Sequence, residues 1–420
     1  MSRNRYLNGC DYLMLAFDHE LRRAGYAGNS CQIIVELGAT IRPDTLRRRL
    51  AESLVQYPLL ASRPAGVVWT RWKPCRTVPT VRLHRDDTGL REQLFNDPLD
   101  ARHGELFRFD LVERDGHAMD LVFTWMHALM DARAAEYFLT GVGRGELPPL
   151  ATETPTIAAS TRTASERWRM AWHATCHIER LARVRSRALR MPVRSLPPRL
   201  KYRIEKISAD ETARVHENAV RVCGVLGQAQ FCAAASVIEL HHLHQRLGTG
   251  SPSYCLPLAV GLRPKGTIEP LFSNQVAMLM IQFLADQLDG LPTIVSALKD
   301  QTQQAMRSGL LEQAIMLAEV SRWLPLPLCL AIMKYSLGGE IASLFYGDAG
   351  AVNQQFTEFL GAPVVDVAHV APVTPSPGLG VVFCRFRNQL RFVVVHAAPV
   401  LSDTEAAEFA ANLRQRLLHP

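Results

Sequence analysis

Several signatures of well-known enzyme chemistries are missing from this 420-residue chain. The sequence has no G-x-x-x-x-G-K-[ST] phosphate-binding loop, no G-x-G-x-x-G after a predicted strand, and no G-x-S-x-G turn. The first two absences remove the best sequence support for nucleotide hydrolysis and for dinucleotide chemistry. The third leaves a hydrolase of the nucleophile-elbow type without a candidate serine.

A zinc site and a disulfide framework are also poorly supported. The nine cysteines form an odd set without a C-x-x-C pair, which favours reduced thiols in the cytoplasm. His241, His242 and His244 lie in a predicted helix without a further ligand at a useful spacing, so we interpret them as a helix-surface cluster. Asp11 and Asp18 interrupt the apolar residues near the start, and no secretory signal is expected. We therefore predict no metal ion, no permanently bound cofactor and a cytoplasmic location.

Apolar runs long enough for a membrane-spanning helix are missing too, although 48% of the residues are apolar. The stretch from Val222 to Ile238 contains two glutamines and a serine, and the stretch from Trp323 to Met333 contains two prolines. Both fall short of the ~20 clean apolar residues that a spanning helix needs. We interpret the first as a core helix. The second is interpreted as an apolar loop and helix, or alternatively as a segment that lies against a membrane or an oily substrate.

The chain divides into two halves of comparable size, separated by a segment punctuated with prolines between 148 and 198. We predict a first domain over 1–160, a basic helical linker over 161–206 and a second domain over 207–420. Hairpin-like strands outnumber alternating strands and helices, which favours an α+β fold over a doubly wound sheet. Predicted strands cover 31–37, 67–73, 254–262, 276–283, 364–370, 379–386 and 390–396, and predicted helices cover 43–57, 209–222, 228–247 and 292–307.

The most informative segment runs from Trp125 to Ala132. Two predicted strands, 106–113 and 119–126, are joined by a hairpin signal just before it, and apolar residues recur at helical spacing just after it. His127 therefore lies where a strand hands over to a helix, a place from which a side chain can reach a cleft while rigid elements hold it. A lone H-x-x-x-D is more often an ordinary polar pair near a helix start, so the motif alone is a weak signal.

Met126 to Ala132 resembles the H-H-x-x-x-D-G signature of condensation domains and chloramphenicol-acetyltransferase-like acyltransferases, with the second His and the Asp in place as His127 and Asp131. Other short segments resemble the same superfamily in the same order along the chain. They are Gln56 to Leu60, Asn96 to Asp100, Leu262-Arg263-Pro264 and Ser273-Asn274.

The chain also departs from the family pattern. Met126 replaces the first His, Ala132 replaces the Gly, and no D-F-G-W-G element occurs. Tyr346 to Gly350 resembles the Y-S-N-x-G element of wax-ester-synthase-like, stand-alone members, with Gly347 and Asp348 in place of Ser and Asn.

The resemblance implies two chloramphenicol-acetyltransferase-like halves that form a V-shaped pseudo-dimer around a central tunnel. His127 would be the general base at its middle, taking a proton from an alcohol or amine that attacks an acyl thioester directly, without a covalent acyl-enzyme. Asp131 would turn away from the tunnel and pair with Arg263. The tunnel residues implied are Trp125, Met130, Asn274, Tyr346, Asp348 and Gly350.

The donor implied is acyl-CoA or an acyl-carrier protein with a phosphopantetheine thioester. A second hypothesis is a catalytically weakened member that binds a carrier-linked acyl or peptidyl chain. Met126 and Ala132 favour it slightly, whereas the intact His127, Asp131 and Arg263 favour the active enzyme. Val276, Met278 and Met280, with the stretch from Trp323 to Met333, supply side chains that line a channel for a medium or long acyl chain, or simply pack the core.

The formal charge of +7 is concentrated between Thr161 and Lys206, where thirteen Arg or Lys residues face three Glu. This excess suits an acidic carrier protein, the phosphates of coenzyme A or an anionic membrane surface contacted peripherally. A solvated helix face explains it equally well. Nucleic acid is not an expected partner, because aromatic interleaving is limited to Trp168, Trp172 and Tyr202.

Overall fold

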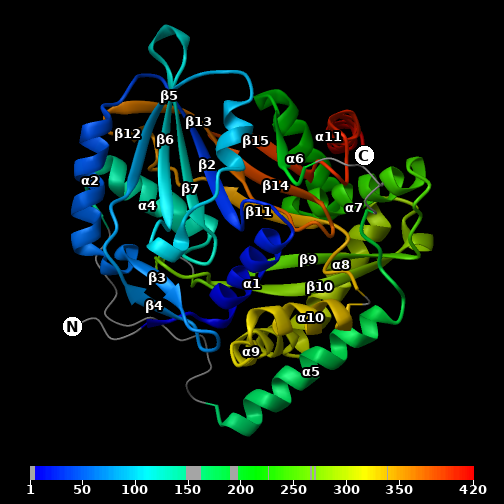
Figure 1. Cartoon of the computed structure of the whole chain (residues 1–420). Helices are drawn as coiled ribbons and strands as arrows, with labels where there is room; N and C mark the ends of the chain where they lie inside the picture. The colour runs from blue at the N-terminus through cyan, green and yellow to red at the C-terminus, as the bar shows by residue number, and fades with distance from the viewer. Residues whose placement is uncertain are drawn as a thin grey trace.

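The protein is described by a computed structural model that covers residues 5–147, 162–189, 197–225, 227–264, 267–268, 271–337 and 339–420. Helices and strands are mixed, and most neighbouring strands are antiparallel, which confirms the predicted α+β class (Figure 1). The helices are α1 (Gly9–Arg23), α2 (Pro43–Gln56), α3 (Leu90–Phe95), α4 (Ala132–Arg144), α5 (Ala164–Ala182), α6 (Ala209–Cys223), α7 (Gln228–Arg246), α8 (Leu291–Arg307), α9 (Leu310–Ser321), α10 (Leu326–Ser336) and α11 (Asp403–Leu418).

Within the described residues, the strands form four sheets. They are β1 (Arg5–Tyr6), β2 (Ser30–Leu37), β3 (Ser62–Ala65), β4 (Arg71–Pro74), β5 (Thr80–Arg85), β6 (Phe107–Glu113), β7 (Met119–Met126), β8 (Leu200–Lys206), β9 (Ser253–Gly261), β10 (Val276–Leu284), β11 (Phe345–Ala351), β12 (Glu358–Phe359), β13 (Ala362–Val370), β14 (Leu379–Phe386) and β15 (Gln389–Ala397). The sheet orders are β12-β13-β2-β7-β6-β5, β11-β14-β15-β8, β10-β9 and β1-β4-β3.

The six-stranded sheet holds β7 near its centre, where all eight residues of the strand are buried. Both faces of the sheet are covered, since alternate residues enter different cores. Ile33 and Phe123 pack in the core that contains α4, whereas Ile34 and Val122 join the core of the second half. Burial on both faces explains why these strands read as continuous apolar runs.

The boundary between the halves differs from the predicted one. Strands β12 and β13 come from the second half of the sequence, yet β13 pairs with β2 in the sheet of the first half. Residues 200–206, predicted as linker, form β8 and pair with β15. The helical part of the predicted linker is α5, while positions 148–161 and 190–196 lie outside the described residues.

Buried and half-buried ion pairs tie the two large sheets together. Asp366 on β13 contacts Arg391 on β15 and accepts a hydrogen bond from Lys206 on β8 at 2.8 Å. Lys206 also reaches Glu36 on β2 at 2.6 Å. Each cation lies on one sheet, and its acidic partners lie on the other. The pairs therefore determine the relative orientation of the two halves as well as the strength of their contact.

A separate corner of the molecule is built from helices α1, α5, α9 and α10 and the β9-β10 ribbon (Figure 1). The β3-β4 hairpin lies beside this helical corner, and the backbone N–H of Trp69 donates to the Arg322 carbonyl at 3.0 Å. The predicted strand over 67–73 is wrong in its first part: residues 66–70 form the hairpin turn, with φ of 113° at Gly66 and 51° at Trp69.

Within the described residues, no single helix has both the length and the apolar composition needed to cross a membrane, although the bent pair α6 and α7 meets the criterion when the two helices are taken together.

The close approach of α1 to α9 depends on Gly9. A Cβ at this position would lie 2.4 Å from the Ala318 carbonyl carbon, and the Gly9 N–H donates to Glu319 Oε1 at 2.6 Å. Because both contacts involve backbone or a fixed carboxylate, we expect Gly9→Ala to lower the free energy of unfolding by about 1–3 kcal/mol. Gly250→Ala is the matched control, since no atom lies within 4 Å of a Cβ there. Equal unfolding midpoints for the two variants in urea would contradict this packing.

Candidate functional site

His127 follows β7 directly and is fixed through its backbone. Its N–H donates to the Asn29 carbonyl at 2.9 Å, and its carbonyl accepts a hydrogen bond from Asn274 Nδ2 at 2.8 Å. His127 is partly exposed as a residue, and its ring Nδ1 is buried. Nε2 is therefore the ring nitrogen that remains as the candidate for contact with an acceptor molecule.

Asp131 caps the start of α4, and its carboxylate contacts residues of the second half of the chain. One carboxylate oxygen caps the helix by accepting from the Ala134 N–H at 3.0 Å. The other contacts the Arg263 guanidinium and accepts from the Gln275 N–H at 3.0 Å. The structure thus brings Asp131 and Arg263 together in a nearly buried pair.

The sequence analysis missed Asp11, which joins this network from α1. Its carboxylate accepts hydrogen bonds from the Asn274 N–H at 2.7 Å and from Asn274 Nδ2 at 2.9 Å. Asn8 caps the same helix in a capping box with Asp11 and also bonds to Ser273. The N-x-x-D spacing of a capping box was the available signal.

Burial shifts the pKa values of both groups nearest Asn274. Desolvation raises the pKa of Asp11 to about 6, and the hydrogen bonds from Asn274 oppose this rise. Desolvation lowers the pKa of His127, while the backbone carbonyls of His127 and Met130 and the charge of Asp131 act in the opposite direction. His127 is therefore neutral at pH 7 and able to accept a proton.

Two residues predicted to line a tunnel are core residues instead. Trp125 is 1% exposed, stacks on Phe123 and donates from Nε1 to the Met130 carbonyl at 2.9 Å. Met130 is 0% exposed and belongs to the same core. Strand alternation and the tight turn direct both side chains into the sheet's packing, so they support the His127 loop rather than face a substrate.

The predicted Tyr346 to Gly350 element forms most of β11. Tyr346 is buried and donates to the Ala229 carbonyl at 2.7 Å, whereas Asp348 is exposed. Gly350 adopts a φ of 71°, and its N–H donates to Asp348 Oδ1 at 2.8 Å. Arg133, two residues after Asp131, donates to the Ala351 carbonyl at 2.8 Å. The element therefore lies near the start of α4 without touching the imidazole.

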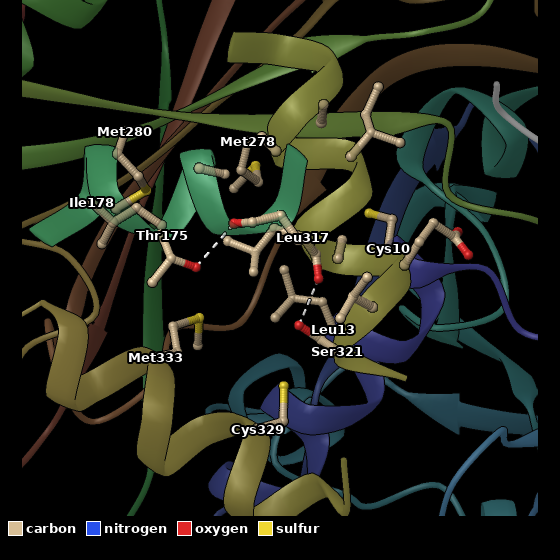
Figure 2. Close-up of a pocket in the computed structure, with 18 of the residues that line it drawn as sticks. Cys10, Leu13, Thr175, Ile178, Met278, Met280, Leu317, Ser321, Cys329 and Met333 are labelled. Atoms are coloured by element: carbon tan, nitrogen blue, oxygen red, sulfur yellow. Dashed lines mark hydrogen bonds between the residues drawn. The ribbon is translucent and has the colours of Figure 1, made fainter. Parts of the chain in front are cut away.

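A pocket of about 400 Å³ lies beside the network, in the helical corner. Figure 2 shows it enclosed by α1, α5, α9, α10 and β10, with Cys10 and Leu13 at one side and Ile178 and Met280 at the other. The pocket and the network share neighbouring residues: Cys10 precedes Asp11, and Val276 follows Gln275. His127 itself is not among the lining residues.

Strand β10 forms one wall of the pocket, and its apolar residues were interpreted either as the lining of a channel or as core packing. Val276, Met278 and Met280 line the pocket and lie outside the core clusters, whereas Ile281 and Phe283 pack in the core of the second half and Leu279 belongs to both. The residues on the two faces alternate along the strand. The interpretation of Val276, Met278 and Met280 as core packing is therefore wrong. Leu324, Cys329, Ile332 and Met333, from the second apolar stretch, also line the pocket.

No group of three or more His, Cys, Asp or Glu side chains suited to a metal ion occurs in the described part of the chain. The interpretation of the three histidines of α7 as a surface cluster needs correction at His244. This side chain is fully buried, and its Nδ1 lies 3.0 Å from Thr249 Oγ1.

We expect Asp131→Ala to lower thermal stability and activity together, because it removes the carboxylate that pairs with the largely buried Arg263 guanidinium. Losing one partner of such a pair costs about 3–5 kcal/mol. Arg263→Ala should act in the same way, and the double variant should show far less than the sum of the two losses. Urea unfolding of the four proteins in a double-mutant cycle measures the coupling. Additive losses would show that the two side chains do not stabilise each other.

Comparison with known proteins gives structural matches alone. No family model and no curated protein sequence matches this chain. The trichothecene 15-O-acetyltransferase TRI3 from Fusarium sporotrichioides matches with a TM-score of 0.72 at 14% identity, covering 99% of this chain and 95% of that one. The first condensation domain of the CDA synthetase matches with a TM-score of 0.71 at 15% identity, covering 100% and 97%.

The condensation domain of the monacolin K polyketide synthase MokA matches with a TM-score of 0.67 at 15% identity, covering 99% of this chain and 97% of that one. All three likenesses extend over nearly the whole length of both proteins. The chain therefore has the fold of condensation domains and of chloramphenicol-acetyltransferase-like acyltransferases, as the resemblance of its motifs predicted.

Proposed function

We propose that this protein is an acyltransferase that moves an acyl group from a thioester to an alcohol or amine, with His127 as the general base. The observation that carries the proposal is that His127 belongs to a network bordering an apolar pocket: Asn274 bonds to the His127 carbonyl, and the pocket residues Cys10 and Val276 adjoin Asp11 and Gln275 of the same network. The fold supports it as well, since the structural neighbours include an acetyltransferase named for transfer to an oxygen. Condensation domains, which are also neighbours, suggest a carrier-linked donor as one source of the thioester.

The proposed reaction is a direct transfer. The acceptor hydroxyl or amine gives its proton to Nε2 of His127 while its oxygen or nitrogen attacks the thioester carbonyl carbon. The tetrahedral intermediate collapses, the C–S bond breaks, and the imidazolium returns the proton to the departing thiolate. Ester or amide and free thiol are the products, so atoms and charge balance without any further reactant.

A covalent route through the nearest thiol has little support. Cys10 lines the pocket next to Asp11, but burial raises the pKa of its thiol, and the charges of Asp11, Asp131 and Glu319 raise it further. The thiolate, rather than the thiol, is the nucleophile in acyl chemistry. The Asp131–Arg263 pair and Asn274 act in this proposal as positioning residues, because they hold the loop that presents the imidazole.

We expect His127→Ala to reduce kcat by about 10²–10⁴ without changing the unfolding midpoint, because the lost group serves proton transfer rather than packing. Release of free thiol from an acyl-CoA, in the presence of alcohol and amine acceptors, measures the rate. His103→Ala, which removes an exposed imidazole, is the control and should keep full activity. A His127 variant that retains more than about a tenth of the wild-type kcat would contradict the general-base assignment.

The pH profile provides an independent test of the same residue. Because burial lowers the pKa of His127 below its ordinary 6.5, protonation of the free base requires a more acidic solution. The acidic limb of kcat/KM should therefore lie below pH 6.5, with activity independent of pH between there and neutrality. A limb centred at or above pH 7 would mean that a different group controls the reaction.

The pocket predicts a medium or long acyl chain rather than acetyl. Each buried methylene adds roughly 0.8 kcal/mol, about fourfold in kcat/KM, until the pocket is full. We expect kcat/KM to rise from acetyl through hexanoyl to decanoyl thioesters. Ala314→Phe, which places a ring in the pocket, should shift the optimum to shorter chains, whereas Ala411→Phe on the exposed side of α11 should not.

A maximum at acetyl would contradict the long-chain assignment while leaving the acyltransferase proposal intact. Tight binding of acyl thioesters without any release of thiol, at every chain length and with every acceptor, would instead favour a binding protein that lacks turnover.

A further inference from the structure

The pocket opens on a face that carries many large apolar side chains. Trp168 and Trp172 are 58% and 63% exposed, and both also line the pocket, so they stand at its opening. On α10, Ile332 shares this double role and lies one turn before Tyr335, which is 86% exposed. We call the following six residues the apolar rim: Trp168, Trp172, Trp323, Leu328, Ile332 and Tyr335.

The spacing of these residues makes each helix present a stripe. Trp168 and Trp172 are four residues apart on α5, and Leu328, Ile332 and Tyr335 follow one another at intervals of four and three on α10. Residues at these intervals share one helix face. The stripes point outward, because all five side chains are at least 45% exposed. These side chains do not contribute to the packing of the core. Exposed apolar patches of this kind mark surfaces that contact another molecule or a membrane.

The turn of the β3-β4 hairpin extends the same face. Trp69 packs edge-on against Trp323, with ring centroids 4.6 Å apart, and the Arg322 guanidinium lies over the Trp69 ring. Val67 and Val68, at the tip of this turn, are 73% and 42% exposed. Figure 1 shows the hairpin, α9, α10 and α5 together along the lower part of the molecule.

Exposed cations flank the apolar residues at both ends of the face. Arg169 and Arg180 are exposed on α5, and Arg71 and Lys73 are exposed on β4, directly after the hairpin turn. Arg183 and Arg185, directly after the end of α5, are exposed as well. Tryptophan and tyrosine rings with nearby basic residues are the combination favoured where protein meets the headgroup region of a bilayer.

We propose that the apolar rim and the hairpin tip dock on an anionic lipid bilayer, so that the apolar pocket opens toward the membrane. The rings and valines enter the interfacial region, while the arginines and lysine contact anionic headgroups. An acyl chain then reaches the pocket without crossing water.

The test measures binding to vesicles and needs no enzymatic activity, so it is independent of the proposed acyl transfer. The full-length protein is sedimented with vesicles of phosphatidylcholine alone and of phosphatidylcholine with phosphatidylglycerol. We expect cosedimentation with the anionic vesicles, weaker binding to the neutral ones, and a loss of binding at high salt.

The double variant Trp168→Ala and Trp172→Ala should reduce partitioning onto anionic vesicles about 10-fold or more, with an unchanged unfolding midpoint. The control is the double variant Val55→Ala and Leu83→Ala, which removes exposed apolar side chains from α2 and β5, on a different part of the molecule (Figure 1). A charge variant, Arg169→Ser with Arg180→Ser, should weaken binding to anionic vesicles and leave binding to neutral ones unchanged.

Several results would overturn the proposal. One is a wild-type protein that stays in the supernatant with anionic vesicles, and another is equal binding by the tryptophan and control variants. A wild-type dimer that the tryptophan substitutions convert to a monomer, without vesicle binding, would assign the face to self-association. Binding of an acidic carrier protein that depends on Trp168 and Trp172, without vesicle binding, would assign it to that partner.

Discussion

The contact between Asp131 and Arg263 connects the two halves of the molecule at the point where the candidate chemistry takes place. Asp131 begins α4 in the first half, and Arg263 comes from the loop after β9 in the second. Both charges are largely removed from water, so the pair contributes little net stability. Removing either partner alone is nevertheless costly, because the remaining charge stays buried without compensation. Asn274 and Gln275, close to Arg263 in space, bond to His127 and Asp131 and make the imidazole's position depend on both halves.

The motif and the β7–α4 junction were predictable because local rules and packing agree there. The strand 119–126 alternates between two buried faces, Asp131 is a favourable cap, and the apolar residues after it recur at helical spacing. The predicted helices 209–222 and 228–247 of the second half were confirmed in the same way, as α6 and α7. In these segments a single pattern indicates one structure.

The helical corner was less predictable. Its apolar residues either pack between helices or line the pocket, and sequence periodicity does not distinguish these two environments. The helices α1 and α9 have mixed faces, since they pack against each other and also line a pocket. Trp125 and Met130 illustrate the opposite error. They lie next to the catalytic candidate in sequence, yet strand alternation and a tight turn direct them into the core. Proximity in sequence to a functional residue does not decide which way a side chain points.

The alternation along β10 separates two kinds of selective constraint within one strand. Leu279, Ile281 and Phe283 determine whether the second half is well packed, and changes there alter stability first. Val276, Met278 and Met280 face the pocket, so they are free to change size or shape without disturbing that core. Under the proposed function, substitutions at Val276, Met278 and Met280 would therefore reshape the pocket at little expense in folding stability, whereas substitutions at Ile281 and Phe283 would reduce stability first.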